Sequence, residues 1–215
     1  MFSKIFPKIH SEGYKFIVIA VILTIVLYSF SNFLGLVGLV LSIWVYYFFR
    51  DPERIIIDDD NYLVSPADGE VIKVEEVDGL KELGFENKKF NKISIFMNVF
   101  DCHVNRTPCA GQVEEILYKP GKFLNASFDK ASEDNERNYY KIKDNHGNDI
   151  IIVQIAGLIA RRIVCETNKN QELKQGDRIG MIRFGSRADV YYENYEPLVK
   201  VGQKAVSGET LLAKK

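Results

Sequence analysis

The chain has 215 residues and a net charge of −1, from 28 Lys and Arg against 29 Asp and Glu, which excludes a broadly basic nucleic-acid-binding protein. Hydrophobic residues make up 47% of the composition, yet the 34 consecutive positions 16–49 carry no charged residue. That uncharged run excludes a fully soluble protein. The remainder, 51–215, holds 24 basic and 28 acidic residues and is long enough to form its own hydrophobic core.

The chain has three cysteines, Cys102, Cys109 and Cys165, an odd number without a CxxC spacing. This pattern argues against a disulfide framework and against a structural zinc site. It favours a reduced, cytoplasmic setting for the polar part of the chain, and we expect no metal centre there.

The apolar run 16–49 is too long for the core of a signal peptide. As a single helix it would extend about 51 Å, well beyond a hydrocarbon core of about 30 Å. The polar stretch Ser29–Gly35 predicts a break, which leaves apolar arms at about 16–28 and 33–49. We therefore predict a hydrophobic helical hairpin, which either spans the bilayer twice or inserts from one side.

Basic residues lie on both sides of this hairpin: Lys4, Lys8 and Lys15 before it, and Arg50 and Arg54 after it. Because cytoplasmic flanks of membrane segments are enriched in Lys and Arg, both ends are predicted to be cytoplasmic. Residues 1–50 are thus predicted to be a membrane anchor, and 51–215 a domain on the cytoplasmic face of the cell membrane.

The polar domain is predicted to be rich in strands. Apolar alternation or a continuous apolar run marks strands within Val64–Val74, Lys92–Val99, Gly111–Tyr118 and Ile150–Ile155, the last of them fully buried. Asp144–Asn148 has the composition of a hairpin turn. The segment Leu158–Val164 fits either a helix or a strand, and the helix is favoured.

Two segments, Leu173–Gly180 and Val199–Val206, each place a glycine before a polar turn and a return strand. Together with Ser65–Gly69 they resemble the folded-over β structure of lipoyl and biotinyl carrier domains. The predicted fold is mostly β (α+β): a lipoyl-like β barrel-sandwich with a few short helices, built from 51–215 as one unit.

Three residues are candidates for chemistry. Asp68 lies in a Ser-Pro-Ala-Asp-Gly turn, His103 follows a strong strand, and Ser186 follows Gly185 near the C-terminus. Taken singly, each has a plain structural explanation, since Asp-Gly is a common turn pair, a lone histidine at a strand end is usually structural, and Gly-Ser is a frequent dipeptide.

Taken jointly and in order, the motifs resemble phosphatidylserine decarboxylase proenzymes, most closely the short bacterial and archaeal form. The resemblance covers nearly the whole chain, including the hydrophobic leader and the Arg50-Asp-Pro52 junction. It rests on five spaced motifs: Ser65–Gly69, Asp101–Arg106, Phe123–Ser127 with Asn135–Asn138, Val153–Arg162 and Phe184–Ser186.

The resemblance implies autocatalytic cleavage between Gly185 and Ser186 into a β chain, 1–185, and an α chain, 186–215. Ser186 would become a covalent pyruvoyl group, a form of pyruvate that serves as the cofactor. Its ketone would form a Schiff base with the amine of phosphatidylserine and accept the electrons released with CO2, giving phosphatidylethanolamine. The implied partners are phosphatidylserine in the bilayer and the chain's own cleaved fragment.

The resemblance also implies roles. Ser186 is the pyruvoyl precursor, His103 protonates the substrate carbon after decarboxylation, as suits an imidazole with an unperturbed pKa of about 6.5, and Asp68 is the processing aspartate. Long-form relatives carry a second histidine three positions after the first, where this chain has Arg106. The base that deprotonates Ser186 therefore stays open between His103 and Asp68.

Other interpretations remain. Arg161 and Arg162 either bind the lipid phosphate or form a solvated or membrane-facing basic pair. Lys130, within Asp129-Lys-Ala-Ser132, is similar to a lipoyl-lysine turn, so the alternative function is a membrane-anchored lipoyl-like carrier or adaptor. A pyruvoyl enzyme that acts on a soluble amino acid or amine is a third option, disfavoured because such a substrate needs no hydrophobic leader.

Overall fold

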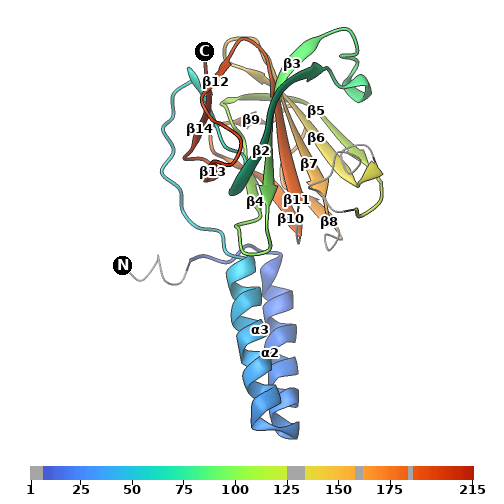
Figure 1. Ribbon diagram of the computed structural model, residues 1–215, viewed down its shortest axis with the longest axis vertical. Coiled ribbons are helices and arrows are strands. Elements are labelled where there is room, and N and C mark those ends of the chain that lie inside the picture. Colours follow the sequence, from blue (N-terminus) through green and yellow to red (C-terminus); the bar gives the residue numbers. More distant parts are fainter. Residues whose placement is uncertain (1–6, 125–133, 158–161, 184–185) are drawn as a thin grey trace. The chain divides into compact units, whose positions relative to one another are not determined.

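The structure, a computed structural model, describes residues 7–124, 134–157, 162–183 and 186–215 (Figure 1). It divides into two compact units, Met1–Glu53 and Arg54–Lys215, which are described separately. The first unit contains two helices, α2 (Gly13–Phe30) and α3 (Asn32–Phe48). Apart from a short 3-10 helix, η1 (Lys81–Leu83), the regular elements described in the second unit are strands.

The helical hairpin turns at a single residue. Ser31 has an extended backbone, with φ −165° and ψ 150°, and ends α2. Its hydroxyl accepts a hydrogen bond from the amide of Leu34 at 3.2 Å, which caps the start of α3. The predicted break within 29–35 is therefore confirmed. The Ser31 side chain stabilises it by accepting a hydrogen bond from an amide at the start of α3 that has no partner within the helix.

The two helices pack closely because small residues line their interface. A side chain at Gly35 would collide with the ring of Tyr28 across the hairpin. The hydroxyls of Thr24 and Ser42 lie 2.9 Å apart and form an interhelical hydrogen bond. Small residues and hydroxyl pairs of this kind hold helices together in an apolar environment.

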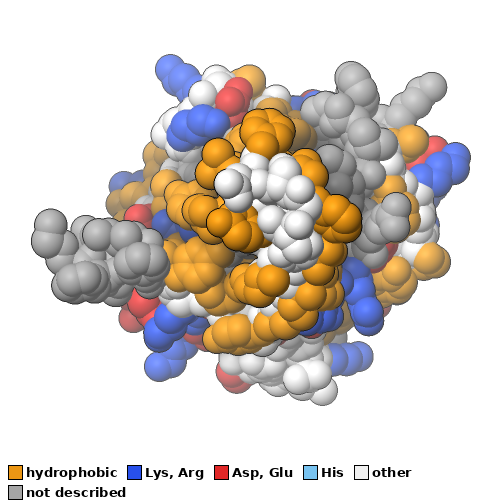
Figure 2. All heavy atoms as spheres, turned by 90° about the horizontal axis from the view of Figure 1, so that it is seen from below, with side chains coloured by type: hydrophobic (Ala, Val, Ile, Leu, Met, Phe, Trp, Pro, Cys, Tyr) orange, Lys and Arg blue, Asp and Glu red, His pale blue; other side chains and the backbone are white. Residues whose placement is uncertain are grey.

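The outside of the hairpin is apolar. Large side chains such as Ile25, Phe30 and Phe33 are 66–75% exposed, and Figure 2 shows hydrophobic side chains around much of the hairpin surface. Helix α2, with 18 residues, is long and apolar enough to cross a membrane by length and composition, whereas α3 has 17 residues. Such a surface is stable in hydrocarbon and unfavourable in water, so the hairpin is consistent with a membrane anchor.

The strands of the second unit form three antiparallel sheets (Figure 1). The large sheet is curled and has the order β13-β2-β3-β11-β7-β6-β5-β9, and two three-stranded sheets have the orders β4-β10-β8 and β1-β14-β12. The strands are β1 (Tyr62–Val64), β2 (Gly69–Asp78), β3 (Lys89–Met97), β4 (Val104–Arg106), β5 (Gly111–Lys119), β6 (Arg137–Asp144), β7 (Asp149–Ala156), β8 (Arg162–Cys165), β9 (Glu172–Leu173), β10 (Arg178–Arg183), β11 (Ser186–Tyr192), β12 (Glu196–Pro197), β13 (Lys204–Ala205) and β14 (Leu211–Lys214).

Strands β7 and β11 lie at the centre of the large sheet, and every residue in both is buried. Apolar clusters cover both faces, one containing Ile152, Ala188 and Val190 and the other Val153 and Tyr191. A strand covered on both faces needs a continuous apolar sequence, which is why the run Ile150–Ile155 was recognisable. The mostly-β prediction and the predicted Asp144–Asn148 hairpin turn are confirmed.

The helix favoured for Leu158–Val164 is wrong where the structure describes that segment. Residues Arg162–Cys165 form β8, which pairs with β10, with Ile163 opposite Ile182. Residues 158–161 lie outside the described residues. The β-branched side chains of Ile163 and Val164 favour a strand, and burial of Ile163 against Ile182 settles the choice.

Gly69 begins β2 with φ +154°, and a side chain there would collide with the carbonyl oxygen of Phe96 on β3. We therefore expect Gly69→Ala to lower the free energy of unfolding by about 2–4 kcal/mol, because it adds backbone strain and a steric clash. Denaturant unfolding measures this loss. Glu70→Ala, the next residue with a half-exposed side chain, is the control, and an equal change in both variants would contradict the explanation.

Candidate active site

Ser186 is the first residue of β11 and lies between two neighbouring strands, opposite Met97 of β3 and Ala156 of β7. Its side chain is fully buried, and its hydroxyl lies 3.9 Å from the Met97 sulfur, a weak acceptor. Phe184 and Gly185 lie outside the described residues, so the structure gives no geometry for the Gly185 carbonyl. The serine thus lies at the start of a central strand, with a neighbouring strand on each side.

His103 lies directly before β4 and is buried. Its Nδ1 atom is 3.0 Å from the carbonyl oxygen of Asp101, and its own carbonyl oxygen accepts a hydrogen bond from the amide of Ile182 at 3.2 Å. Ile182 is near the end of β10, the strand whose chain continues toward Ser186. The backbone thus holds the histidine segment against the strand that leads to the serine.

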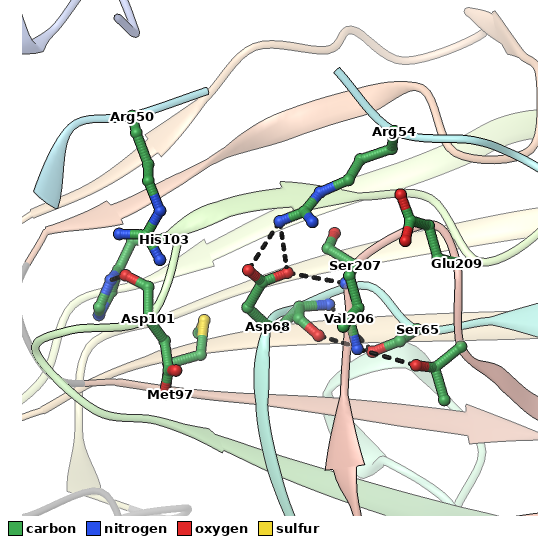
Figure 3. Close-up of polar contacts among 12 residues, drawn as sticks. Arg50, Arg54, Ser65, Asp68, Met97, Asp101, His103, Val206, Ser207 and Glu209 are labelled. Carbon is green, nitrogen blue, oxygen red and sulfur yellow. Dashed lines mark hydrogen bonds and ion pairs between the residues drawn. The ribbon is translucent and has the colours of Figure 1, made fainter. Parts of the chain in front are cut away.

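Asp68 lies in the Ser65–Gly69 turn, and Figure 3 shows its contacts. Both carboxylate oxygens accept hydrogen bonds from Arg54 Nη2, at 2.8 and 2.7 Å, and Oδ1 also accepts from the amide of Ser207 at 2.8 Å. The side chains of Arg54 and Asp68 are each 14% exposed, so solvent screens this ion pair only partly.

The turn that carries Asp68 is also held from the C-terminal segment. The Ser207 hydroxyl donates to the carbonyl oxygen of Pro66 at 3.1 Å, and the amide of Gly208 donates to that of Ser65 at 2.7 Å. Residues far apart in the sequence therefore fix the position of the aspartate.

A sequence profile of the phosphatidylserine decarboxylase family matches residues 41–213. A phosphatidylserine decarboxylase proenzyme of Pelagibacter ubique (strain HTCC1062) is 79% identical to the chain, and the alignment covers all of both chains. The chain belongs to the phosphatidylserine decarboxylase family.

Two further relatives carry the same name. The protein of Ruegeria pomeroyi is 51% identical over 95% of this chain and 94% of its own length. That of Cereibacter sphaeroides is 50% identical over 99% of this chain and 92% of its own length. The resemblance inferred from five motifs is therefore confirmed, and the family identifies the chain as a decarboxylase.

Arg54 contacts the candidate site, and the sequence did not predict this contact. Arg54 was interpreted as one of the basic residues that flank the hydrophobic run. The sequence places Arg54 shortly before the Ser65–Gly69 turn that contains Asp68. Such spacing alone does not predict an ion pair. The side chain's contact with Asp68 comes from the fold.

Replacing Arg54 with alanine is expected to leave the Asp68 carboxylate mostly buried without its guanidinium. The expected loss in free energy of unfolding is about 1.5–3 kcal/mol, the usual contribution of hydrogen bonds to a charged group. The control is Lys204→Ala, which removes a more exposed ion pair to Glu70 and is expected to cost under about 1 kcal/mol. Equal denaturation midpoints for both variants would contradict a structural role for Arg54.

A buried ion pair follows Ser186 on β11. Arg187 donates from Nε to Asp189 Oδ1 at 2.6 Å and from Nη2 to Oδ2 at 2.5 Å, and both side chains are fully buried. Successive strand residues point to opposite faces, so this pair lies on the face of β11 opposite to Ser186. The side chains of this pair therefore point away from the face that carries the serine hydroxyl.

The remaining sequence candidates are less constrained. Arg162 is exposed on β8, in register with Arg183 of β10, while Arg161 and Lys130 lie outside the described residues. No cluster of three or more metal-ligating side chains occurs among the described residues.

Proposed function

We propose that the protein decarboxylates phosphatidylserine to phosphatidylethanolamine and CO2, using a pyruvoyl group that it makes from Ser186 by cleaving its own backbone at Gly185–Ser186. One observation carries the proposal: the chain is 79% identical, over its full length, to a relative named a phosphatidylserine decarboxylase proenzyme. The word proenzyme fits an inactive precursor that is processed. The same finding favours an enzyme over a lipoyl-like carrier.

The cleavage uses groups of the chain itself. The Ser186 hydroxyl loses its proton to a base and attacks the Gly185 carbonyl carbon, so that an ester replaces the peptide bond. Elimination across Ser186 releases a carboxylate at Gly185 and leaves dehydroalanine at 186. Addition of water then releases ammonia and leaves the ketone. Mass and charge balance with one water consumed and one ammonia released.

The surroundings of Ser186 fit this conversion. Its hydroxyl is buried and has the Met97 sulfur, a weak acceptor, as its described hydrogen-bond partner. The Met97 sulfur does not compete strongly for the hydroxyl proton, which leaves that proton available to a base. The ketone supplies a carbonyl that condenses with the substrate amine and accepts the electrons released with CO2, chemistry that the standard side chains lack.

Several contacts support a stable two-chain enzyme after cleavage. Residues 186–215 contribute β11, which pairs with β3 and β7, and β13 and β14, which pair with β2 and β1. Asp68 also binds the amide of Ser207. We assign the β chain to 1–185 and the α chain to 186–215, and expect them to stay associated without a covalent link.

We assign His103 as the proton donor to the substrate carbon and as the base for Ser186. The second assignment is supported by Asp68, whose two oxygens are both bound by Arg54. That carboxylate is engaged in an ion pair that holds its own turn in place. Asp68 then acts in processing by holding its turn against the C-terminal segment through Ser207.

The helical hairpin supports a substrate that stays in the bilayer. Moving the acyl chains of phosphatidylserine into water costs about 0.8 kcal/mol per CH2, so the enzyme must act at the bilayer. We assign residues 1–50 as the anchor and 51–215 as the catalytic domain, on the cytoplasmic face of the cell membrane. The apolar exterior of α2 and α3 supports an anchor.

The full-length protein reconstituted in vesicles tests the activity. Vesicles containing phosphatidylserine with a labelled serine carboxylate should release labelled CO2 and accumulate phosphatidylethanolamine. Vesicles with phosphatidylserine labelled only in its acyl chains should release no labelled gas. Absence of CO2 release from a fully cleaved preparation would overturn the proposed function.

A further inference from the structure

Three polar side chains form a buried chain of hydrogen bonds beside Ser186. Asn105, Gln154 and Tyr140 are each fully buried. The Gln154 amide nitrogen donates to Asn105 Oδ1 at 2.9 Å, and the Tyr140 hydroxyl lies 2.8 Å from Gln154 Oε1. Burying three polar side chains in an apolar core is unfavourable unless each is hydrogen-bonded, so their arrangement is specific.

The network has one favoured orientation. The Tyr140 hydroxyl faces two acceptors, Gln154 Oε1 and the Ile179 carbonyl oxygen at 3.1 Å, so it acts as the donor. Burial raises the pKa of Tyr140, which keeps that proton in place. At the other end, Asn105 Nδ2 lies 3.3 Å from the carbonyl oxygen of Pro66. Reversing the Asn105 amide would bring two oxygens together there.

The Asn105 amide group connects the three segments that carry the candidate catalytic residues. Its Nδ2 donates to Pro66, which is two residues before Asp68 in the same turn. Asn105 itself is two residues after His103. The same Nδ2 lies 3.6 Å from the Met97 sulfur, which is 3.9 Å from the Ser186 hydroxyl.

Gln154 joins this arrangement to the serine strand. It lies on β7 opposite Ala188, while Ser186 lies opposite Ala156. Since alternate residues of a strand share a face, the side chains of Gln154 and Ser186 point to the same side of the sheet. A polar amide inside the otherwise apolar run Ile150–Ile155 was the sequence signal for this network.

We propose that Asn105 is a positioning residue for the self-cleavage, whose amide holds the Asp68 turn, the His103 segment and the Met97–Ser186 strand pair in one arrangement, with Gln154 and Tyr140 fixing its orientation. The inference rests on the proposed function. It assigns to these residues the alignment of the serine with its base, and no contact with the lipid.

The test follows cleavage of the full-length chain by electrophoresis, which does not depend on decarboxylation. The chain is made by a short cell-free synthesis pulse with phospholipid vesicles, and the conversion to fragments is timed in buffers of different pH. Asn105→Asp has nearly the same shape but loses the amide donor when ionised. We expect its cleavage to be about 10- to 100-fold slower than that of the unmodified chain at neutral pH and above.

The pH dependence separates positioning from a merely structural role. When the new carboxyl is protonated, its O–H donates to Pro66 in place of the amide. The ratio of the Asn105→Asp rate to the unmodified rate should therefore rise as pH falls. A ratio near one at every pH would overturn the inference, whereas failure of the unmodified chain to cleave would overturn the proposed function instead.

A matched pair of tyrosines provides a second test in case the aspartate variant fails to fold. Tyr140→Phe removes only the hydroxyl that orients Gln154, and we expect cleavage about 3- to 30-fold slower. Tyr139→Phe alters the neighbouring residue of β6, which belongs to the apolar cluster on the other face of the sheet, and should leave the rate unchanged. Equal cleavage rates in the Tyr140→Phe and Tyr139→Phe variants would contradict the proposal.

Discussion

Replacing Ser186 with alanine is expected to leave a single uncut chain without decarboxylase activity. Alanine has no hydroxyl to attack the Gly185 carbonyl, so neither the chain break nor the ketone forms. Among the described residues, the hydrogen-bond partner of the Ser186 hydroxyl is the Met97 sulfur, a weak acceptor, so the variant should fold with nearly unchanged stability. Electrophoresis under denaturing conditions measures cleavage, and CO2 release from phosphatidylserine vesicles measures activity.

Ser94→Ala is the matched control for this loss. Ser94 is also fully buried and lies on the neighbouring strand β3, opposite Asp189 of β11. It should cleave and decarboxylate like the unmodified protein. Normal turnover in the Ser186→Ala protein would be incompatible with a pyruvoyl group made at this position.

Replacing His103 with alanine is expected to slow cleavage and to reduce decarboxylation in the molecules that do cleave. Loss of a positioned proton donor typically costs about 10²- to 10⁴-fold in rate. The cleaved fraction is therefore isolated first, and the rate is expressed per cleaved molecule. This separates the effect on substrate protonation from the effect on processing.

The control histidine is His146, which is exposed in the turn between β6 and β7. His146→Ala should cleave and decarboxylate at the rates of the unmodified protein. If fully cleaved His103→Ala protein decarboxylates as fast as the unmodified enzyme, then His103 is structural and another group supplies the proton.

The sequence predicted the parts of the fold that local pattern determines. The run Ile150–Ile155 is recognisable as a buried strand because both faces of β7 are covered, and Ser31 ends α2 within the predicted break. The helix prediction for Leu158–Val164 was wrong because a short segment of apolar and basic residues fits the helical and the strand period alike. Pairing of its described part with β10, a contact far along the chain, determines the strand.

The candidate site was only partly predictable for the same reason. Motif order gave Asp68, His103 and Ser186 as candidates, but the contacts around them join distant residues. Met97 reaches Ser186 because β3 and β11 are neighbours in the large sheet, and Arg54 reaches Asp68 because of how the chain folds between them. Neither contact can be predicted from the spacing of these residues along the sequence.

Intact-mass spectrometry of the freshly purified, active full-length protein tests the central claim most directly. The account predicts two polypeptides, one ending at Gly185 and one spanning 186–215. The smaller one should be lighter, by the mass of one ammonia molecule, than a peptide that begins with an unmodified serine. An active preparation that consists of one unbroken chain with serine at position 186 would contradict it.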